Sequence, residues 1–240
     1  MTYDYAALSP VKRHWLTKTS NIPRRFYGWE PQDIIDDKGS FPEAINDWVS
    51  DVTGGHIIMN PGALGMTGKG LLFDGKPGKG KTTHAVVTLM EIIRQLPADP
   101  EECRKLLYMS AEDFGMRSRP VYYLTMTDLL YLKKSAFEAE GETRKRLQAE
   151  MEGFHGRSTD DRMNVRVLVL DDLGKEYGSK YDGFSFDEIL RSRYDRGLPT
   201  IITTNTDISD WRSRYSEAME SFAHEAFRRV QLGGVDLRKR

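Results

Sequence analysis

The chain has 240 residues, of which 39% are apolar and 30% charged, so it can form one large α/β domain with a small appendage and is not a disordered protein. The formal net charge of −1 gives no general attraction to nucleic acid, although a local basic stripe can still bind phosphates. A single cysteine, Cys103, excludes an internal disulfide, and no apolar run approaches the roughly 20 residues of a membrane span. Since the first ten residues also lack the pattern of a signal peptide, we expect a cytoplasmic protein.

The first 54 residues predict a short helical N-terminal segment ahead of the main domain at 55–240. Ser9 is the expected N-cap of a basic helix at 10–18, with Pro10 in its first position. A second helix is expected at 42–52, where apolar residues recur on one face. Gly and Pro between 60 and 70 then predict a loop that leads into the main domain.

The main domain alternates apolar runs with amphipathic runs. Strands are expected at 70–74, 121–126, 165–170, 200–204 and 230–232, with a possible short one at 106–109. Helices are expected at 81–96, 128–137 with a possible extension through 150, 186–196 and 218–228, and Thr127 is the expected cap of the second. Strands separated by helices predict a parallel sheet with helices on both faces, which is an α/β fold.

The strongest motif is a phosphate-binding loop between the strand at 70–74 and the helix at 81–96. Its residues are Gly75, Lys76, Pro77, Gly78, Lys79, Gly80, Lys81 and Thr82. Glycines let backbone N–H groups converge on phosphates, and the helix directs its positive N-terminal end, at Lys81 to Thr83, toward the same anion. Lys81 would bridge the β and γ phosphates of ATP, and Thr82 would bind Mg²⁺. A glycine- and lysine-rich surface turn is the alternative, which the flanking strand and helix disfavour.

A pair of acids follows the apolar strand at 165–170. Asp171 and Asp172 would stand at the carboxyl edge of a buried strand, where open α/β sheets bind their ligands. Asp171 is the expected Mg²⁺ partner, and Asp172 would orient or deprotonate the attacking water. Aspartate is one methylene shorter than the glutamate that many such ATPases use, so Asp172 either reaches through a small shift or supports only slow hydrolysis. A solvated acidic turn is the alternative.

Two further groups of polar residues could complete such a site. Asn205 follows the strand at 200–204 and could hydrogen-bond the attacking water or the γ-phosphate, or could simply be a turn residue. An arginine supplied by a neighbouring subunit can accelerate phosphoryl transfer by several orders of magnitude. The candidates are Arg191, Arg193, Arg196, Arg228, Arg229 and Arg238, and for any single one a solvated helix charge is the alternative.

Basic and aromatic residues also mix between 122 and 146. They are Tyr122, Tyr123, Tyr131, Lys133, Lys134, Arg144, Lys145 and Arg146. Such a mixture can form a groove for single-stranded DNA. Five glutamates interleave with them between 138 and 152, so a solvated charged helix is an equal alternative.

The order of these motifs resembles the AAA+ ATPases of the DnaC/DnaI helicase-loader type and their IstB-like transposase-helper relatives. The resemblance rests on the phosphate loop, the acids at 171–172, the run from Ile189 to Asn205, the lead-in at 22–26 and the arginine-bearing tail at 227–238. It implies the sheet order 5-1-4-3-2. It also implies that Asn205 is the sensor 1 residue, that Arg229 or its neighbour Arg228 is the trans-acting finger, and that Arg238 is a sensor 2 residue near the nucleotide.

The resemblance further implies three functions to be weighed. The first is an Mg²⁺-dependent ATPase that assembles as a homo-oligomer on single-stranded DNA and loads or remodels a replicative DNA helicase. The second is an IstB-type ATPase that regulates DNA transposition. The third is an ATP-dependent assembly scaffold with little turnover.

Overall fold

The computed structural model describes residues 7–34, 42–54, 67–97, 99, 101–103, 115–174 and 180–232. The possible strand at 106–109 and the predicted sensor 2 residue Arg238 lie outside these ranges. No helix in the described ranges combines the length and apolar character needed to cross a membrane.

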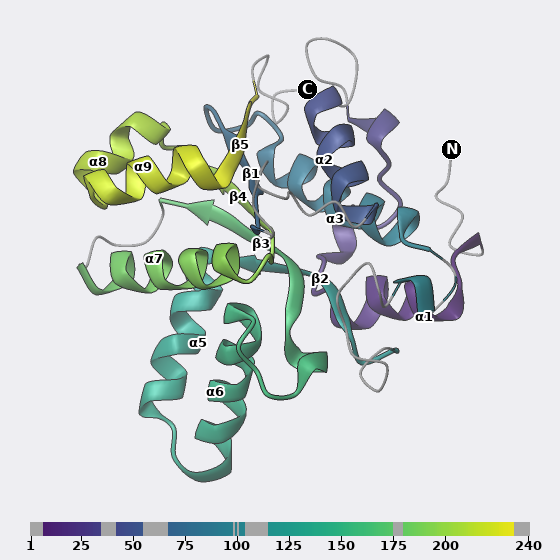
Figure 1. The fold of residues 1–240 in the computed structure, drawn as a ribbon, viewed down its shortest axis with the longest axis horizontal. Helices are drawn as coiled ribbons and strands as arrows, with labels where there is room; N and C mark the ends of the chain where they lie inside the picture. Colours follow the sequence, from purple (N-terminus) through teal and green to yellow (C-terminus); the bar gives the residue numbers. More distant parts are fainter. Residues whose placement is uncertain are drawn as a thin grey trace.

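A parallel sheet forms the centre of the described structure (Figure 1). Its five strands follow the order β2-β3-β4-β1-β5, which confirms the predicted order. Their bounds are Gly70–Asp74 for β1, Arg119–Thr125 for β2, Val165–Leu173 for β3, Thr200–Thr204 for β4 and Phe227–Gln231 for β5. All the paired strands are parallel, so the ends of β1, β3 and β4 that carry the predicted site residues share one edge of the sheet.

Helices cover both faces of the sheet, as the alternating pattern predicts (Figure 1). The helices α2 (Glu43–Thr53) and α3 (Lys81–Gln95) pack on one face, where they share a core with alternate strand residues such as Phe73 and Val169. The other face carries α5 (Met126–Glu138), α6 (Gly141–His155), α7 (Lys180–Asp195), α8 (Trp211–Arg214) and α9 (Glu217–Ala226). Buried strands are apolar on both faces for this reason.

The N-terminal lead-in packs against the α3 face and the edge strand β2. Helix α1 (Pro10–His14) begins at the predicted N-cap Ser9 and continues as a π-helical turn, η2 (Trp15–Thr19). Two 3-10 turns follow at η3 (Arg24–Phe26) and η4 (Pro31–Asp33). Trp15 and Leu16 are fully buried in the same core as α3, so this lead-in is packed on the sheet's helical layer.

Several predicted boundaries are wrong by a few residues. Helix α5 begins at Met126 because Thr125, not Thr127, is its N-cap and accepts a hydrogen bond from the Asp128 N–H at 3.0 Å. The predicted extension through 150 is a separate helix, because Ala139 and Glu140 are extended and Gly141, with a φ of +57°, starts α6. Strand β3 continues to Leu173. The last strand begins at Phe227 because this segment pairs with β1 from Gly70 onward.

Candidate nucleotide-binding site

The phosphate loop joins β1 to α3 at the carboxyl edge of the sheet. Gly75, Gly78 and Gly80 have φ values of +141°, +81° and +76°, which side chains with a Cβ rarely adopt. A Cβ on Gly75 would also lie 2.6 Å from the carbonyl oxygen of Leu232. Gly80 is the left-handed N-cap of α3, so the first N–H groups of that helix have no acceptor within it. This loop is therefore shaped to present backbone donors to an anion.

Lys81 folds back over the loop that it follows. Its ammonium group donates to the carbonyl oxygens of Gly75 at 2.7 Å and Lys76 at 2.9 Å, and the residue is buried. These two acceptors hold the charge near the place where bound phosphates would sit. Thr82 and Thr83 are half-buried in the first turn of α3, whereas Lys76 and Pro77 are exposed at the tip of the loop.

Asp171 lies at the centre of a network of hydroxyl groups. The hydroxyl of Thr82 lies 2.9 Å and 3.1 Å from its two carboxylate oxygens. Thr203 on β4 donates to Oδ1 at 2.6 Å, and Tyr123 on β2 donates to Oδ2 at 2.7 Å. Burial and the adjacent Asp171 raise the pKa of Tyr123, which keeps its hydroxyl protonated as a donor. The structure thus brings together Thr82 and Asp171, the two residues that the sequence assigns to Mg²⁺.

The donor set at Thr82 and Asp171 fits Mg²⁺, since this cation prefers oxygen ligands and is commonly held by one or two carboxylates plus phosphates and waters. Among the described residues, His, Cys, Asp and Glu side chains form no cluster of three that could hold a metal by themselves. A cation here would therefore rely on phosphate and water oxygens for its remaining ligands.

Asp172 stands on a bulge in β3. The β3–β4 register shifts between Leu170 and Leu173, and Asp172 has a φ of +60° in the left-handed region. Its N–H donates to the hydroxyl of Thr203 at 2.9 Å, so one threonine fixes both acids. Bulges re-aim side chains beside functional sites, and aspartate tolerates this backbone better than most residues. Asp172 is half-buried next to Asp171 at the same edge.

Asn205 lies just beyond β4 and is exposed at the same edge of the sheet. Its role as a sensor stays a prediction. The network contacts come instead from its neighbours Thr203 and Thr204, the second of which donates to the Leu173 carbonyl at 2.9 Å. The sequence pattern drew attention to this strand end but not to the contact of Thr203 with the two acids, and it placed Tyr123 with a possible DNA groove. The position of Tyr123 inside an apolar strand could have indicated its role, because the hydroxyl of a buried tyrosine usually has a hydrogen-bond partner.

Arg229 is engaged within its own chain. Its guanidinium binds Oδ2 of Asp74, with the Nε donating at 3.0 Å, and also binds the carboxylate of Asp207. Asp74 is buried and immediately precedes the phosphate loop. These hydrogen bonds, with the one to Asp74 foremost, raise the pKa of Arg229. Arg228 donates to the Ala44 carbonyl at 3.2 Å on the other side of β5.

The remaining arginine candidates differ in their surroundings. Arg193 is fully buried and donates to the carbonyl oxygens of Phe154, Val165, Arg166 and Pro199 and to the Thr200 hydroxyl, at 2.8 to 3.0 Å. Burial lowers its pKa to about 9. It therefore clamps the amino ends of β3 and β4 and is not available to a neighbouring subunit. Arg191 pairs with Asp187 at 2.7 Å, and Arg196 is exposed.

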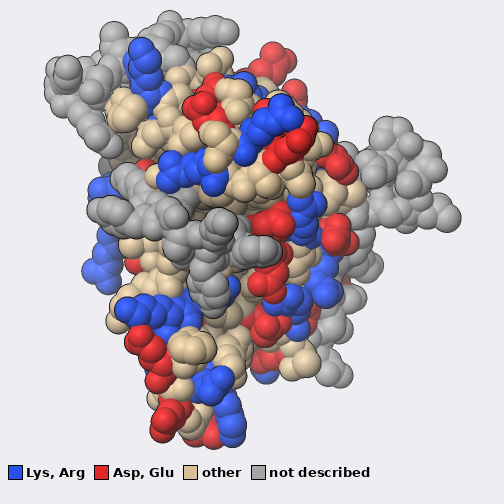
Figure 2. Space-filling model, turned by 90° about the vertical axis from the view of Figure 1, so that its left-hand side faces the viewer, with Lys and Arg blue, Asp and Glu red and all other residues tan. Residues whose placement is uncertain are grey.

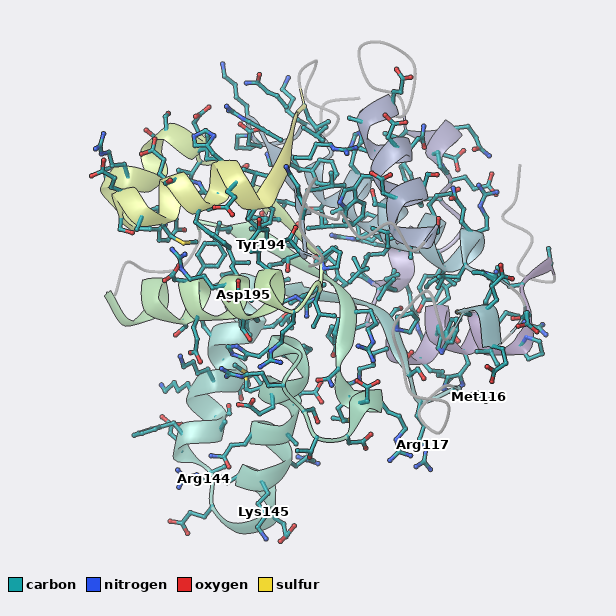
Figure 3. All side chains as sticks on the ribbon, in the orientation of Figure 1. Met116, Arg117, Arg144, Lys145, Tyr194 and Asp195 are labelled. Atoms are coloured by element: carbon teal, nitrogen blue, oxygen red, sulfur yellow. The ribbon has the colours of Figure 1, made fainter. Side chains whose placement is uncertain are left out.

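The residues of the predicted basic and aromatic groove are dispersed over β2 and the α5–α6 hairpin. Lys134 and Lys145 pair with glutamates on their own helices, at 3.7 Å and 2.8 Å. Arg144 and Lys145 lie at the far end of the hairpin (Figure 3). Tyr131 is 73% exposed, whereas Tyr123 is buried beside Asp171. The groove is not formed by these residues together.

No protein-family model matches the chain. Over 139 residues the chain is 25% identical to the replicative helicase loader DnaC of Escherichia coli K12. The matched stretch covers 58% of this chain and 43% of that protein. The chain thus spans less than half the length of the curated relatives that it matches.

Solved structures resemble the chain over most of its length. A DnaI structure matches with a TM-score of 0.58 at 18% identity, covering 89% of this chain and 96% of that one. A structure of the DnaC helicase loader matches with a TM-score of 0.55 at 24% identity, covering 88% of this chain and all of that one. The replication initiator DnaA bound to AMPPCP and single-stranded DNA matches with a TM-score of 0.53 at 14% identity, covering 89% of this chain and 51% of that one.

At these identities the structural matches establish the fold, which is that of the AAA+ P-loop proteins. Together with the sequence match, they support a DnaC/DnaI-type AAA+ protein.

Proposed function

We propose that this DnaC/DnaI-type AAA+ chain is an Mg²⁺-dependent ATPase that binds single-stranded DNA and loads or remodels a replicative DNA helicase. The observation that carries the ATPase part is the contact between Thr82 at the phosphate loop and Asp171 on β3. The helicase and DNA parts are supported by the similarity to the DnaC helicase loader and to DnaA bound to single-stranded DNA.

Each residue of the site has a separate role in the proposed hydrolysis. Backbone N–H groups of the glycine loop and Lys81 bind the phosphates, with Lys81 exchanging its carbonyl acceptors for phosphate oxygens. Thr82 and Asp171 would hold Mg²⁺, which neutralises charge that develops on the phosphates. Asp172 would orient the attacking water, and Asn205 would contact the same water or the γ-phosphate. The Thr203 hydroxyl keeps the two acids in register.

A neighbouring subunit would complete the site in a homo-oligomer. In this proposal Arg229 is the trans-acting finger, and it would have to leave Asp74 and Asp207 to reach the γ-phosphate of a neighbour. Arg228 is the alternative finger, and Arg238 is proposed to contact the nucleotide. ATP binding would then close subunit interfaces, and hydrolysis would release the assembly.

A second candidate function is an assembly scaffold that binds ATP with little turnover. The short side chain of Asp172 and its left-handed backbone favour it, because the carboxylate of this residue has less reach than a glutamate. The further alternative is an IstB-type role in transposition, in which the protein would bind duplex DNA and not single-stranded DNA.

The nucleotide site is tested with Lys81→Ala and Thr82→Ala in a fluorescent ATP-analogue binding assay. We expect Lys81→Ala to abolish binding and Thr82→Ala to remove its Mg²⁺ dependence, while Lys76→Ala at the exposed tip binds nearly as wild type. ATP binding by Lys81→Ala at wild-type affinity would refute the proposal.

The three functions are then separated by turnover and capture. Turnover stimulated by single-stranded DNA, together with a co-purifying hexameric helicase, supports the helicase-loader proposal. Stimulation by duplex DNA alone supports the transposition role. ATP binding without turnover under either condition supports the scaffold.

A further inference from the structure

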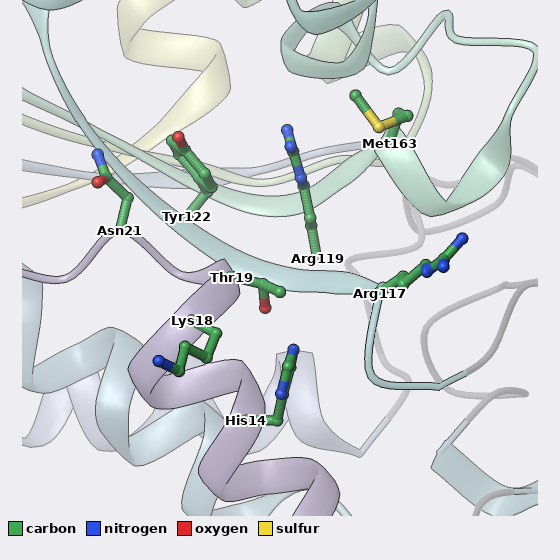
Figure 4. Close-up of a pocket in the computed structure, with 8 residues that line it drawn as sticks. All are labelled: His14, Lys18, Thr19, Asn21, Arg117, Arg119, Tyr122 and Met163. Atoms are coloured by element: carbon green, nitrogen blue, oxygen red, sulfur yellow. The ribbon is translucent and has the colours of Figure 1, made fainter.

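A basic pocket lies between the N-terminal lead-in and the start of the edge strand β2 (Figure 4). Its volume is about 360 Å³, within the range of small-ligand sites. The residues that line it are His14, Lys18, Thr19, Asn21, Arg117, Arg119, Tyr122 and Met163. Because Arg119 begins β2 and the phosphate loop stands at the carboxyl edge of the sheet, the pocket is separate from the nucleotide site.

The charged residues that line the pocket carry charge of one sign. No acidic residue is among its lining residues, whereas Lys18, Arg117 and Arg119 are cationic. Arg119 is bound bidentately by Glu150, at 2.7 and 3.1 Å. Within the described ranges, Lys18 and Arg117 form no ion pair, and both are exposed on opposite sides of the pocket. Two exposed cations can thus attract an anion, and an acid that acts on one of them is Asp160, whose pKa Arg117 helps to lower after the larger effect of Arg162.

An aromatic ring forms part of the wall. Tyr122 is half-buried, with its ring 5.1 Å from that of Phe154 and the Arg119 guanidinium 5.4 Å from its centroid. Met163 adds a second apolar surface to the lining. Apolar and aromatic surface beside exposed cations suits a ligand that carries both a base and a phosphate.

The pocket is held rigidly by contacts between the lead-in and the segment entering β2. Trp15 donates its indole N–H to the Gly115 carbonyl at 2.9 Å, and the Thr19 hydroxyl donates to the Ser118 carbonyl at 3.3 Å. Asn21 donates its side-chain amide to the Tyr123 carbonyl at 2.9 Å. A site built in this way needs little ordering when it binds a ligand.

On the face that carries α7, α8, α9 and the α5–α6 hairpin, the residues that the structure describes carry charges of both signs. Lys and Arg intermingle there with Asp and Glu (Figure 2). Several of the cations on this face are paired, among them Arg191 with Asp187 and Arg212 with Glu217. Charges of alternating sign give little net attraction to a polyanion.

We propose that this pocket binds a unit of single-stranded nucleic acid, with a phosphodiester between Lys18 and Arg117 and the adjoining base against Tyr122. The inference rests on the proposed DNA-binding function and names the surface that performs it. Such contacts are independent of sequence, so binding at this pocket is expected to tolerate any base and to weaken with salt.

The test measures anisotropy of a labelled oligothymidylate with the full chain at several KCl concentrations. The variants are Lys18→Gln, Arg117→Gln and their double, and the matched control is Arg212→Gln, an exposed arginine on α8 that loses the same charge. We expect severalfold weaker binding for each single variant. The slope of log K against log salt should fall by about 0.7 for each lost contact. The control should bind as wild type, and all variants should bind an ATP analogue normally.

The outcomes separate this inference from the proposed function. If wild type binds DNA and the double variant keeps both its affinity and its salt slope, the pocket assignment is overturned and the DNA-binding function stands. If wild type fails to bind DNA at low salt, the DNA-binding function itself is wrong. If labelled deoxynucleotide monophosphate binding is lost in the double variant while oligonucleotide binding is not, the ligand is a free nucleotide and the strand proposal is overturned.

Discussion

Arg229 ties β5 to the base of the phosphate loop, and we expect Arg229→Ala to destabilise the isolated subunit. The substitution leaves the carboxylate of Asp74, whose side chain is 2% exposed, without its guanidinium partner. Among the described residues, the other oxygen of Asp74 already lacks a hydrogen-bond partner. An uncompensated buried charge is the physical cause of the expected loss.

The size of the effect follows from burial. Breaking a buried ion pair on one side costs about 3–5 kcal/mol. The side chain of Arg229 is 36% exposed, so water can reach the vacated carboxylate, and we expect about 2–3 kcal/mol here. For a domain of this size each kcal/mol lowers Tm by about 2–4 °C, which gives a decrease of roughly 4–12 °C.

The assay is thermal unfolding of dilute protein without nucleotide, so that subunit contacts do not contribute. Asp74→Asn combined with Arg229→Ala removes the buried charge and should recover more than half of the lost Tm. Arg228→Ala is the control, since its partner Asp51 lies at 3.4 Å and is 37% exposed, and it should cost under about 1 kcal/mol. An Arg229→Ala protein that unfolds at the wild-type temperature would refute the reasoning, as would a double variant no more stable than the single one.

Three further predictions concern stability and the metal site. Arg193→Met should cost about 4 kcal/mol in urea unfolding because it leaves five acceptors without their donor, four of them in buried hydrogen bonds, whereas Arg191→Met on the same helix should cost under about 1 kcal/mol. Burial lowers the pKa of His155 from 6.5 to about 4, so the unfolded chain binds more protons between these values. Stability should therefore fall by about 3 kcal/mol as pH drops from 6.5 to 4, and a His155→Gln variant that kept this pH dependence would exclude His155 as its source. Tyr123→Phe should raise the Mg²⁺ concentration for half-maximal nucleotide binding about tenfold, because the hydroxyl orients Asp171, and an unchanged Mg²⁺ titration would contradict that role.

The parts of the site that follow one another along the chain could be predicted from sequence. The spacing of Gly75, Gly80 and Lys81 predicts the phosphate loop, because the shape of this loop depends on local backbone conformation. The position of Asp171 follows from the apolar run before it, since such runs are buried strands whose ends meet at one edge. Local patterns were sufficient for these features.

Contacts between distant segments could not be predicted in the same way. Arg229 meets Asp74 because Leu72 pairs with Arg229 in the β1–β5 register, and nothing in either segment specifies that register. The burial of Arg193 similarly depends on four carbonyl groups supplied by three different segments of the backbone. The start of α5 differs from the prediction because Thr125, two residues before the predicted Thr127, provides the cap.

The lead-in also has a consequence for how the subunits can associate. Strand β2 stands at one edge of the sheet, and the Tyr123 N–H there donates to the Ser20 carbonyl at 2.8 Å. The Asn21 side chain occupies the Tyr123 carbonyl as well. Exposed edges invite strand-by-strand aggregation, and this edge is shielded along the stretch that the lead-in covers. Self-assembly beside β2 must therefore proceed through side-chain surfaces and not by extending the sheet.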